Sequence, residues 1–518
     1  MSTRFAAVCL TLALLGPVSA QHADISGRIR AEATERSQVM RTAQVLTDLY
    51  GPRLTGSPNL KAAGEWAVER MGEWGLTGGR LEPWDWGRPG WVNERLAAHI
   101  VAPVKDALVA EAVAWTPGTN GVVSARAFHL DWPDRPTAEE LNAYLERVRQ
   151  RVGGRIVLAG PATSVPINFN PPAKRHDDAA MEARFDPNRG PGGGRGGRAA
   201  GDGPRLSAAQ ISRRIDEFLV ANRALLRVND AAREHGQIAA FDNRTWDVTR
   251  AVPTVVLRNE DYGRIARLLA AGQPVDLEFD IVNRLIPEGR TAYNAIAEIE
   301  GTDKRDEIVM IGGHLDSWHS ATGATDNAIG CAVMMEAARI VKALGVRPRR
   351  TIRVALWSGE EQGLLGSRAY VRQHFGSFED PKPGFEKLVA YLNIDNGTGR
   401  VRGADVFGPP AAAAVVRDAL KPFRDLGVAG AVAVNSRVVG STDSASFNNA
   451  GLPGINFRQD PVEYDTHTHH TNLDTYERIS EDDAKSSSAV IAAVVYELAM
   501  RDERLPRFTK ADMPEPRR

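Results

Sequence analysis

The stretch IGGHLDSWHSATGATDNAIG, residues 311–330, decides how the rest of the chain is interpreted. The apolar run 307–311 is typical of a buried strand, and the Asp326-Asn327 pair opens a segment with helical character. In open α/β sheets, functional side chains collect at the carboxyl ends of the strands. His314 and Asp326 are therefore candidate metal ligands at one edge of a sheet.

The composition is that of a globular protein with more than one domain. The chain has 518 residues, of which 43% are hydrophobic and 25% charged, and its formal net charge is −1. A chain of this length usually forms two or three domains. The balanced charge gives no indication of a nucleic-acid partner or of binding to a membrane surface. We therefore expect no nucleic-acid partner.

The N-terminal segment has the pattern of a secretory signal peptide. Arg4 supplies a positive start, residues 5–15 are mostly apolar, and residues 17–20 have the small side chains of a cleavage site. This apolar run is too short to span a bilayer, so we expect no integral membrane span. We predict that residues 1–20 are removed after Ala20 and that the mature protein is secreted or periplasmic.

The remaining chain predicts an α/β fold interrupted by an insertion. Residues 21–104 contain two helical patterns and the first part of the main domain, and residues 105–286 contain short β-like runs that predict an inserted β-rich domain. Within the insertion, residues 185–204 have no apolar period, which predicts a disordered Gly/Arg-rich loop. From 287 to 518, apolar strands alternate with helices, which predicts a twisted, mostly parallel sheet between helices.

Each later strand of this sheet is followed by a carboxylate or an imidazole. Glu360 and Glu361 follow the strand 351–357, and Asp395 follows the strand 388–394. The loop after the last strand carries three histidines, His467, His469 and His470. Imidazole and carboxylate ligands without a thiolate suit Zn²⁺, with Co²⁺ or Mn²⁺ as substitutes at a harder site.

Five ligand positions, counting one histidine from this loop, exceed the three protein ligands of a usual catalytic zinc ion. They suit two ions that share one carboxylate. The adjacent Glu360 and Glu361 fit this interpretation, because one carboxylate can bind metal while its neighbour acts as a general base.

Each candidate also has a purely structural interpretation. His314 fits a core histidine bonded to Asp316, the pair Glu360-Glu361 fits a helix start, and Asp395 fits a helix cap. These interpretations do not explain why all the candidates follow strands, so we favour a metal centre. Asp443, further along the chain, is predicted to cap a helix rather than to bind metal.

Five motifs in order, HLDSW, TDNAIG, SGEEQGLLGS, NIDN and HHTNLDT, resemble those of the M28 family of co-catalytic zinc peptidases. The resemblance is strongest to the family's secreted plasma glutamate carboxypeptidase (carboxypeptidase Q) branch. It implies a zinc exopeptidase-like fold with an inserted protease-associated-type domain. It also implies an exported di-zinc exopeptidase that cleaves terminal bonds of short peptides, either an aminopeptidase or a dipeptide-cleaving carboxypeptidase. It leaves a homodimer open.

The resemblance further implies a role for each candidate residue. His314 and Asp395 bind one zinc ion, and Asp326 bridges both ions. Glu361 binds the second ion together with the histidine that precedes a Thr-x-x-Asp sequence, which selects His470 over His467 and His469. Asp316 orients His314, and Glu360 is the general base. The Asp326–Asn327 bond falls where the family often has a cis peptide.

Two other functions stay open at this point. One is a catalytically silent, peptidase-like binding module, which the intact set of ligands and base disfavours. The other is glutaminyl cyclase-type amide chemistry on a metal pair, over which the adjacent Glu360 and Glu361 favour a peptidase.

Overall fold

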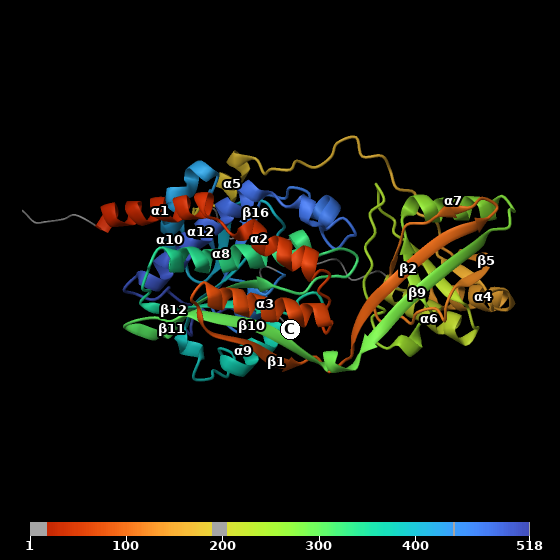
Figure 1. Ribbon diagram of the computed structural model, residues 1–518, viewed down its shortest axis with the longest axis horizontal. Helices are drawn as coiled ribbons and strands as arrows, with labels where there is room; N and C mark the ends of the chain where they lie inside the picture. The colour runs from red at the N-terminus through yellow and green to blue at the C-terminus, as the bar shows by residue number, and fades with distance from the viewer. Residues whose placement is uncertain (1–17, 189–204, 439–440, 517–518) are drawn as a thin grey trace, which may run out of the picture.

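The computed structural model describes residues 18–188, 205–438 and 441–516, and it contains two units, each built on an eight-stranded sheet (Figure 1). The larger unit has the strand order β1-β10-β12-β11-β13-β16-β14-β15. The smaller unit has the order β3-β2-β9-β5-β6-β7-β8-β4. The chain passes from β1 to β2 and returns from β9 to β10, and one further segment between β6 and β7 also reaches the larger unit.

The first sheet is mixed, with a parallel centre. β12 (Arg350–Trp357), β11 (Lys304–His314), β13 (Leu388–Asn393) and β16 (Gly454–Gln459) run parallel to one another. β10 (Thr291–Ile299) and β1 (Thr77–Asp85) add antiparallel pairs on one side, and β14 (Val401–Phe407) with β15 (Gly430–Val434) extends the other side. Every residue of β13 and β14 is buried, as expected for apolar strands covered on both faces.

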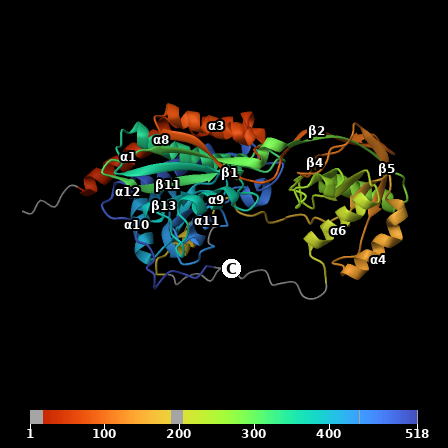
Figure 2. The ribbon, with the colours of Figure 1, turned by 90° about the horizontal axis from the view of Figure 1, so that it is seen from below.

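Helices cover both faces of this sheet. Side chains of six described helices share one core with the sheet: α1 (Val18–Glu35), α2 (Val39–Gln44), α3 (Pro58–Glu73), α8 (Ile329–Ala343), α10 (Pro410–Leu420) and α12 (Glu481–Met500). α10 packs against β14, β15 and α12. α9 (Leu365–His374) and α11 (Ser444–Asn449) contribute to a second core, and Figure 2 shows α3 and α9 on opposite sides of the sheet. The predicted α/β sheet between helices is confirmed.

The smaller unit contains helices as well as strands. Its long strands are β2 (Gly90–Ala102) and β9 (Asp276–Ile286), and its short ones are β3 (Asp106–Ala107), β4 (Ala110–Ala112), β5 (Val123–Leu130), β6 (Ile156–Ala159), β7 (Leu226–Asp230) and β8 (Thr254–Leu257). β5 to β8 run parallel, with helices α4 (Ala138–Val148), α6 (Ala208–Ala221) and α7 (Asn259–Ala270) near them in the chain. β2 precedes residue 105 yet belongs to this sheet. The domain boundaries and the protease-associated type of the insertion stay predictions.

One segment of the insertion crosses to the larger unit. After β6 the chain runs to α5 (Asp178–Arg184), which lies on the larger unit (Figure 1), where Arg184 pairs with Asp405 of β14. Phe185 follows and is buried, and its ring would lie 2.5 Å from a Cβ added at Gly403. The predicted disorder of 185–204 is therefore wrong at its first residue, because this aromatic ring packs where β14 lacks a side chain. Residues 189–204 lie outside the described part of the chain.

The predicted signal peptide falls mostly on residues 1–17, which also lie outside the described part. The first described element is α1, which begins at Val18. Among the described residues, no helix combines the length and apolar character needed to cross a membrane.

The central strand β11 supplies a test of the packing. Ile311 is fully buried in the main core, so Ile311→Ala should lower the free energy of unfolding by about 2–5 kcal/mol through lost contacts and a cavity. Denaturant unfolding followed by tryptophan fluorescence measures the change. Leu49→Ala is the control, because Leu49 is 66% exposed and should change the value by less than about 0.5 kcal/mol. Equal effects of the two substitutions would contradict the buried position of Ile311.

Candidate metal centre

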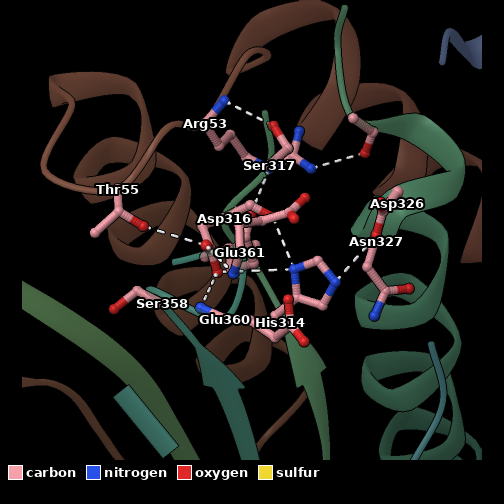
Figure 3. Close-up of polar contacts among 12 residues, drawn as sticks. Arg53, Thr55, His314, Asp316, Ser317, Asp326, Asn327, Ser358, Glu360 and Glu361 are labelled. Atoms are coloured by element: carbon pink, nitrogen blue, oxygen red, sulfur yellow. Dashed lines mark hydrogen bonds and ion pairs between the residues drawn. The ribbon is translucent and has the colours of Figure 1, made fainter. Parts of the chain in front are cut away.

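Candidate ligands meet at the carboxyl edge of the first sheet, where the sequence predicted them. His314 is the last residue of β11, and Asp326 lies in the turn η5 (Ala324–Ala328) that leads into α8 (Figure 3). Glu361 follows β12, Asp395 follows β13, and His470 lies in the loop after β16. The order β12-β11-β13-β16 makes these strand ends neighbours in space.

A first group of three consists of His314, Asp326 and Asp395. His314 Nε2 lies 3.2 Å from Asp326 Oδ1 and 3.1 Å from Asp395 Oδ1. One ligand atom from each residue lies within 4.8 Å of the others, and His314 and Asp326 are buried. The three side chains therefore present an imidazole and two carboxylates to a common point.

A second group uses the other oxygen of the same aspartate. His470 Nε2 lies 3.2 Å from Asp326 Oδ2 and 2.9 Å from Glu361 Oε2. Asp326 thus turns one oxygen toward His314 and the other toward His470. A carboxylate in this position can bridge two metal ions, which is the arrangement of co-catalytic hydrolases.

His470 is the best placed of the three loop histidines. His469 Nε2 is 3.9 Å from Asp326 Oδ2, and the His469 ring packs against Tyr464 and His470. His467 shares a hydrogen bond with the Thr466 hydroxyl and stacks its ring on His235 of the smaller unit. These contacts favour His470 as the ligand, and the ligand assignment stays a prediction.

The electrostatics of the groups fit bound cations. Burial and the nearby Asp326 raise the pKa of Glu361 to about 7. Burial lowers the pKa of His470, but Glu361 and Asp326 outweigh it and raise the value to about 10. Glu361 Oε1 is buried and accepts no hydrogen bond from the described residues. A buried acceptor without a donor is rare, and a metal ion beside it would satisfy it.

The Asp316 carboxylate holds the turn that carries the two glutamates. Asp316 Oδ1 accepts a hydrogen bond from the backbone N–H of Glu360 at 3.2 Å, and Oδ2 accepts one from Glu361 at 3.2 Å (Figure 3). Thr55 Oγ1 donates to Oδ2 at 3.1 Å. The ring of His314 bonds instead to the backbone carbonyl of Asp316, from Nδ1 at 3.0 Å, while the carboxylate is 3.7 Å away. Asp316 therefore orients His314 of the first group through its backbone and Glu361 of the second group through its side chain.

Glu360 belongs to neither group of three. Burial, reinforced by the nearby Asp395 and Asp443, raises its pKa well above the ordinary value for a glutamate, although His314 acts in the opposite direction. A carboxylate with a raised pKa that binds no metal is suited to accept a proton at neutral pH.

Arg53, which sequence reasoning missed, supports the loop between His314 and Asp326. Its fully buried guanidinium donates to the carbonyls of Leu315 at 2.7 Å, Thr322 at 2.8 Å and Gly323 at 2.8 Å. These bonds fix both ends of the loop. The fold brings Arg53 next to this loop. No recognisable motif surrounds residue 53 in the sequence, so sequence reasoning had no signal for this contact.

Asp474 ties the histidine loop to the bridging residue. Its carboxylate accepts hydrogen bonds from the backbone N–H groups of Thr325 at 2.6 Å and Asp326 at 3.1 Å. The peptide bond between Asp326 and Asn327 is cis.

The prediction that the Asp443 side chain caps a helix is wrong. Asp443 does precede α11, but its side chain makes no capping hydrogen bond. The carboxylate is fully buried, and burial raises its pKa to about 7, although Ser367 acts in the opposite direction. Its backbone N–H bonds to the Thr442 hydroxyl, so the turn is organised by Thr442 instead.

Comparison with known sequences supports the family resemblance. Residues 294–495 match "Peptidase family M28", which confirms the resemblance found in the sequence. Mouse carboxypeptidase Q is 31% identical over 259 residues, which are 49% of this chain and 52% of the mouse protein. Human carboxypeptidase Q is 25% identical over 468 residues, 89% of this chain and 85% of the human protein. The stronger match thus spans only about half the length of its relative.

Solved structures with the same fold cover nearly the whole chain. A peptidase M28 precursor from Shewanella amazonensis SB2B has a TM-score of 0.66 and 24% identity, covering 95% of this chain and 100% of that one. BSAP, a zinc aminopeptidase from Bacillus subtilis, has a TM-score of 0.56 and 18% identity, covering 92% and 97%. At these identities the likeness establishes the fold.

Metal binding at this centre should release protons. Burial lowers the pKa of His314, but Asp395 and Glu360 outweigh it and raise the value well above the ordinary one, and the pKa of His470 is raised to about 10. His470 is therefore protonated at pH 8 and must become neutral to bind metal, so zinc should release at least one proton and bind more tightly as pH rises toward 10. Calorimetry in buffers of different ionisation enthalpy measures the release.

The control for this prediction is His470→Ala, which should release about one proton fewer at pH 8. Zinc binding with no proton release, or with the same release in both proteins, would contradict the participation of His470.

Proposed function

We propose that this protein is a di-zinc exopeptidase that hydrolyses the terminal bonds of short peptides. The proposal follows from the match of residues 294–495 to peptidase family M28. One observation carries the proposal. The two oxygens of Asp326 face two different histidines, each 3.2 Å away, and each histidine is paired with a further carboxylate. A single-metal site has no need of this duplicated arrangement.

The residues present fit two zinc ions. His314 and Asp395 would hold one ion, Glu361 and His470 would hold the other, and Asp326 would contact both. When bound, the ions supply Lewis acidity and lower the pKa of water. Nitrogen and oxygen donors of this kind also accept Co²⁺ or Mn²⁺, so these ions are expected substitutes.

The protein's own groups perform the proton transfers. Glu360 takes a proton from the attacking water and returns it to the departing amine, so the same carboxylate serves as base and then as acid. Asp316 fixes the backbone of Glu360 and Glu361 through the two N–H bonds, and it thereby sets the distance between the base and the ligands. Burial of the centre limits access of bulk water.

Unsatisfied polar groups beside the ligands support a bound peptide end. Trp318, with Asp326 and His470, lines a pocket at the metal centre, and its Nε1 has no hydrogen-bond partner among the described residues. Nδ1 of His319, Oγ of Ser320 and the amide of Gln362 are likewise buried without partners in that part of the chain. Native proteins rarely leave such groups unpaired, and the charged terminus of a short peptide would supply partners.

The N-terminal pattern of residues 1–20 supports export of this enzyme, because a basic start, an apolar run and a small-residue cleavage site occur together. We infer action outside the cytoplasm. Mass determination of the mature N-terminus tests this, and a mature chain that retains Met1 would contradict it.

Glu360→Gln should keep both ions and lose most turnover. The substitution retains shape but removes the group that accepts the proton, so kcat should fall about 10²–10⁴-fold. Metal analysis and dipeptide hydrolysis measure the two properties on the same sample. The matched variants His314→Ala and Asp326→Ala should instead lose metal. A near-normal rate in Glu360→Gln with full metal content would remove Glu360 from its role.

The substrate end is tested with a panel of dipeptides that are free, N-acetylated or C-amidated. Loss of cleavage on N-acetylation identifies an aminopeptidase or dipeptidase, and loss on amidation identifies a carboxypeptidase. A parallel assay with peptides that begin with glutamine detects cyclisation. Cyclisation without hydrolysis would overturn the proposed peptidase activity, and so would binding of every peptide without turnover.

A further inference from the structure

We propose that the insertion is part of the metal centre, because two of its segments clamp the loop 460–474 and thereby position His470. This inference rests on the proposed di-zinc function. Measuring the two zinc-binding steps tests the inference apart from catalytic activity. We call residues 174–176 the first arm, residues 235–241 the second arm, and residues 460–474 the clamped loop.

His470 needs external support more than the other ligands do. His314 ends a strand of the buried sheet, and Glu361 and Asp395 follow such strands closely. His470 lies in an irregular loop and has a φ of 60°, in the left-handed region that non-glycine residues seldom occupy. Such a conformation costs about 1–3 kcal/mol and persists only where surrounding contacts fix it.

The first arm holds the beginning of the clamped loop. The backbone N–H of Val462 donates to the carbonyl of Lys174 at 2.9 Å, and Lys174 Nζ lies 2.8 Å from Glu463. The backbone N–H of His176 donates to Asp460 Oδ1 at 2.9 Å. The chain just after β16 is therefore held by residues that belong, in sequence, to the insertion.

Arg175 anchors the first arm by pairing with two buried carboxylates, those of Asp460 and Asp483. Asp460 is completely buried, and its carboxylate lies 3.3 Å from Arg175, 3.2 Å from Arg400 and 2.8 Å from Arg402. Arg175 also binds both oxygens of Asp483 on α12, with one bond of 2.9 Å. Without Arg175, Asp460 would keep Arg400 and Arg402, but the buried Asp483 would lose both bonds from this guanidinium. Removing a partner from a buried charge is expensive, so the pairing with Asp483 gives the arm a defined position.

The second arm holds the end of the clamped loop. Asn472 donates from its backbone N–H to the carbonyl of Ile238 at 2.9 Å, and its Oδ1 accepts from the Ile238 N–H at 2.8 Å. Asn472 Nδ2 also donates to the carbonyl of Gly236 at 3.3 Å. Phe241 places its ring at right angles to His470, with centroids 5.5 Å apart, and so contacts the ligand itself.

The two metal positions should therefore respond differently when an arm is removed. His314 and Asp395 are held by the strands of the first sheet, and neither arm contacts them in the described structure. His470 lies between the two clamped ends of its loop. Losing one arm should weaken the position formed by Glu361 and His470 and leave the position formed by His314 and Asp395 nearly unchanged.

The test compares Arg175→Gln with Arg184→Gln in the full chain. Arg184 lies on the same crossing segment and pairs with Asp405 at 3.2 Å, but Asp405 keeps Arg458 at 2.7 Å and lies outside the clamped loop. Zinc titration against a competing chelator measures each binding step. Arg175→Gln should weaken the second step about 10–100-fold, as loss of supporting contacts around metal ligands commonly does, and change the first less than about twofold. Arg184→Gln should match the unaltered protein.

Two further variants keep the test decisive if Arg175→Gln folds poorly. Arg175→Lys retains the charge and should restore part of the affinity, whereas Asn472→Ala removes the two side-chain bonds to the second arm and should cause the same selective loss. Two unchanged binding steps in both Arg175→Gln and Asn472→Ala overturn the clamp and leave the proposed function intact. Equal weakening of both steps also overturns it. An unaltered protein that binds fewer than two ions instead contradicts the di-zinc function.

Discussion

The whole centre depends on the orientation of Asp326. Its two oxygens point to different histidines, and this orientation requires support from every side. Arg53 fixes the loop before it, and Asp474 accepts its backbone N–H together with that of Thr325. A carboxylate fixed in this way needs no rearrangement to serve two cations, which is the general advantage of a preorganised polar site.

Much of this architecture could be predicted from sequence because the strands of the first sheet are short, apolar and regularly spaced. Parallel strands deliver their following residues to one edge, so the strand pattern alone was enough to place His314, Glu361 and Asp395 together. The side-chain bonds within that edge could not be predicted in this way. Asp316 looked like a partner for His314, whereas its carboxylate serves the backbone of Glu360 and Glu361.

The insertion was harder to predict for two physical reasons. Its short strands carry little periodic signal, and four of them, β5 to β8, pair in parallel, so local pattern alone suggested a mainly β unit. The contacts of Arg175 and Phe241 join residues more than two hundred positions apart. Contacts of this kind follow from the packed fold and leave no motif in a single sequence.

Arg53 also bears on what counts as a complete folding unit. The segment matched to the peptidase family begins at residue 294, yet the carbonyls of Leu315, Thr322 and Gly323 find their donor in a residue far upstream of that point. A fragment limited to the matched segment would contain every candidate ligand and still leave those carbonyls without this donor. The shortest fragment that could form this centre must therefore include the donors of its buried hydrogen bonds, and the matched segment alone does not include them.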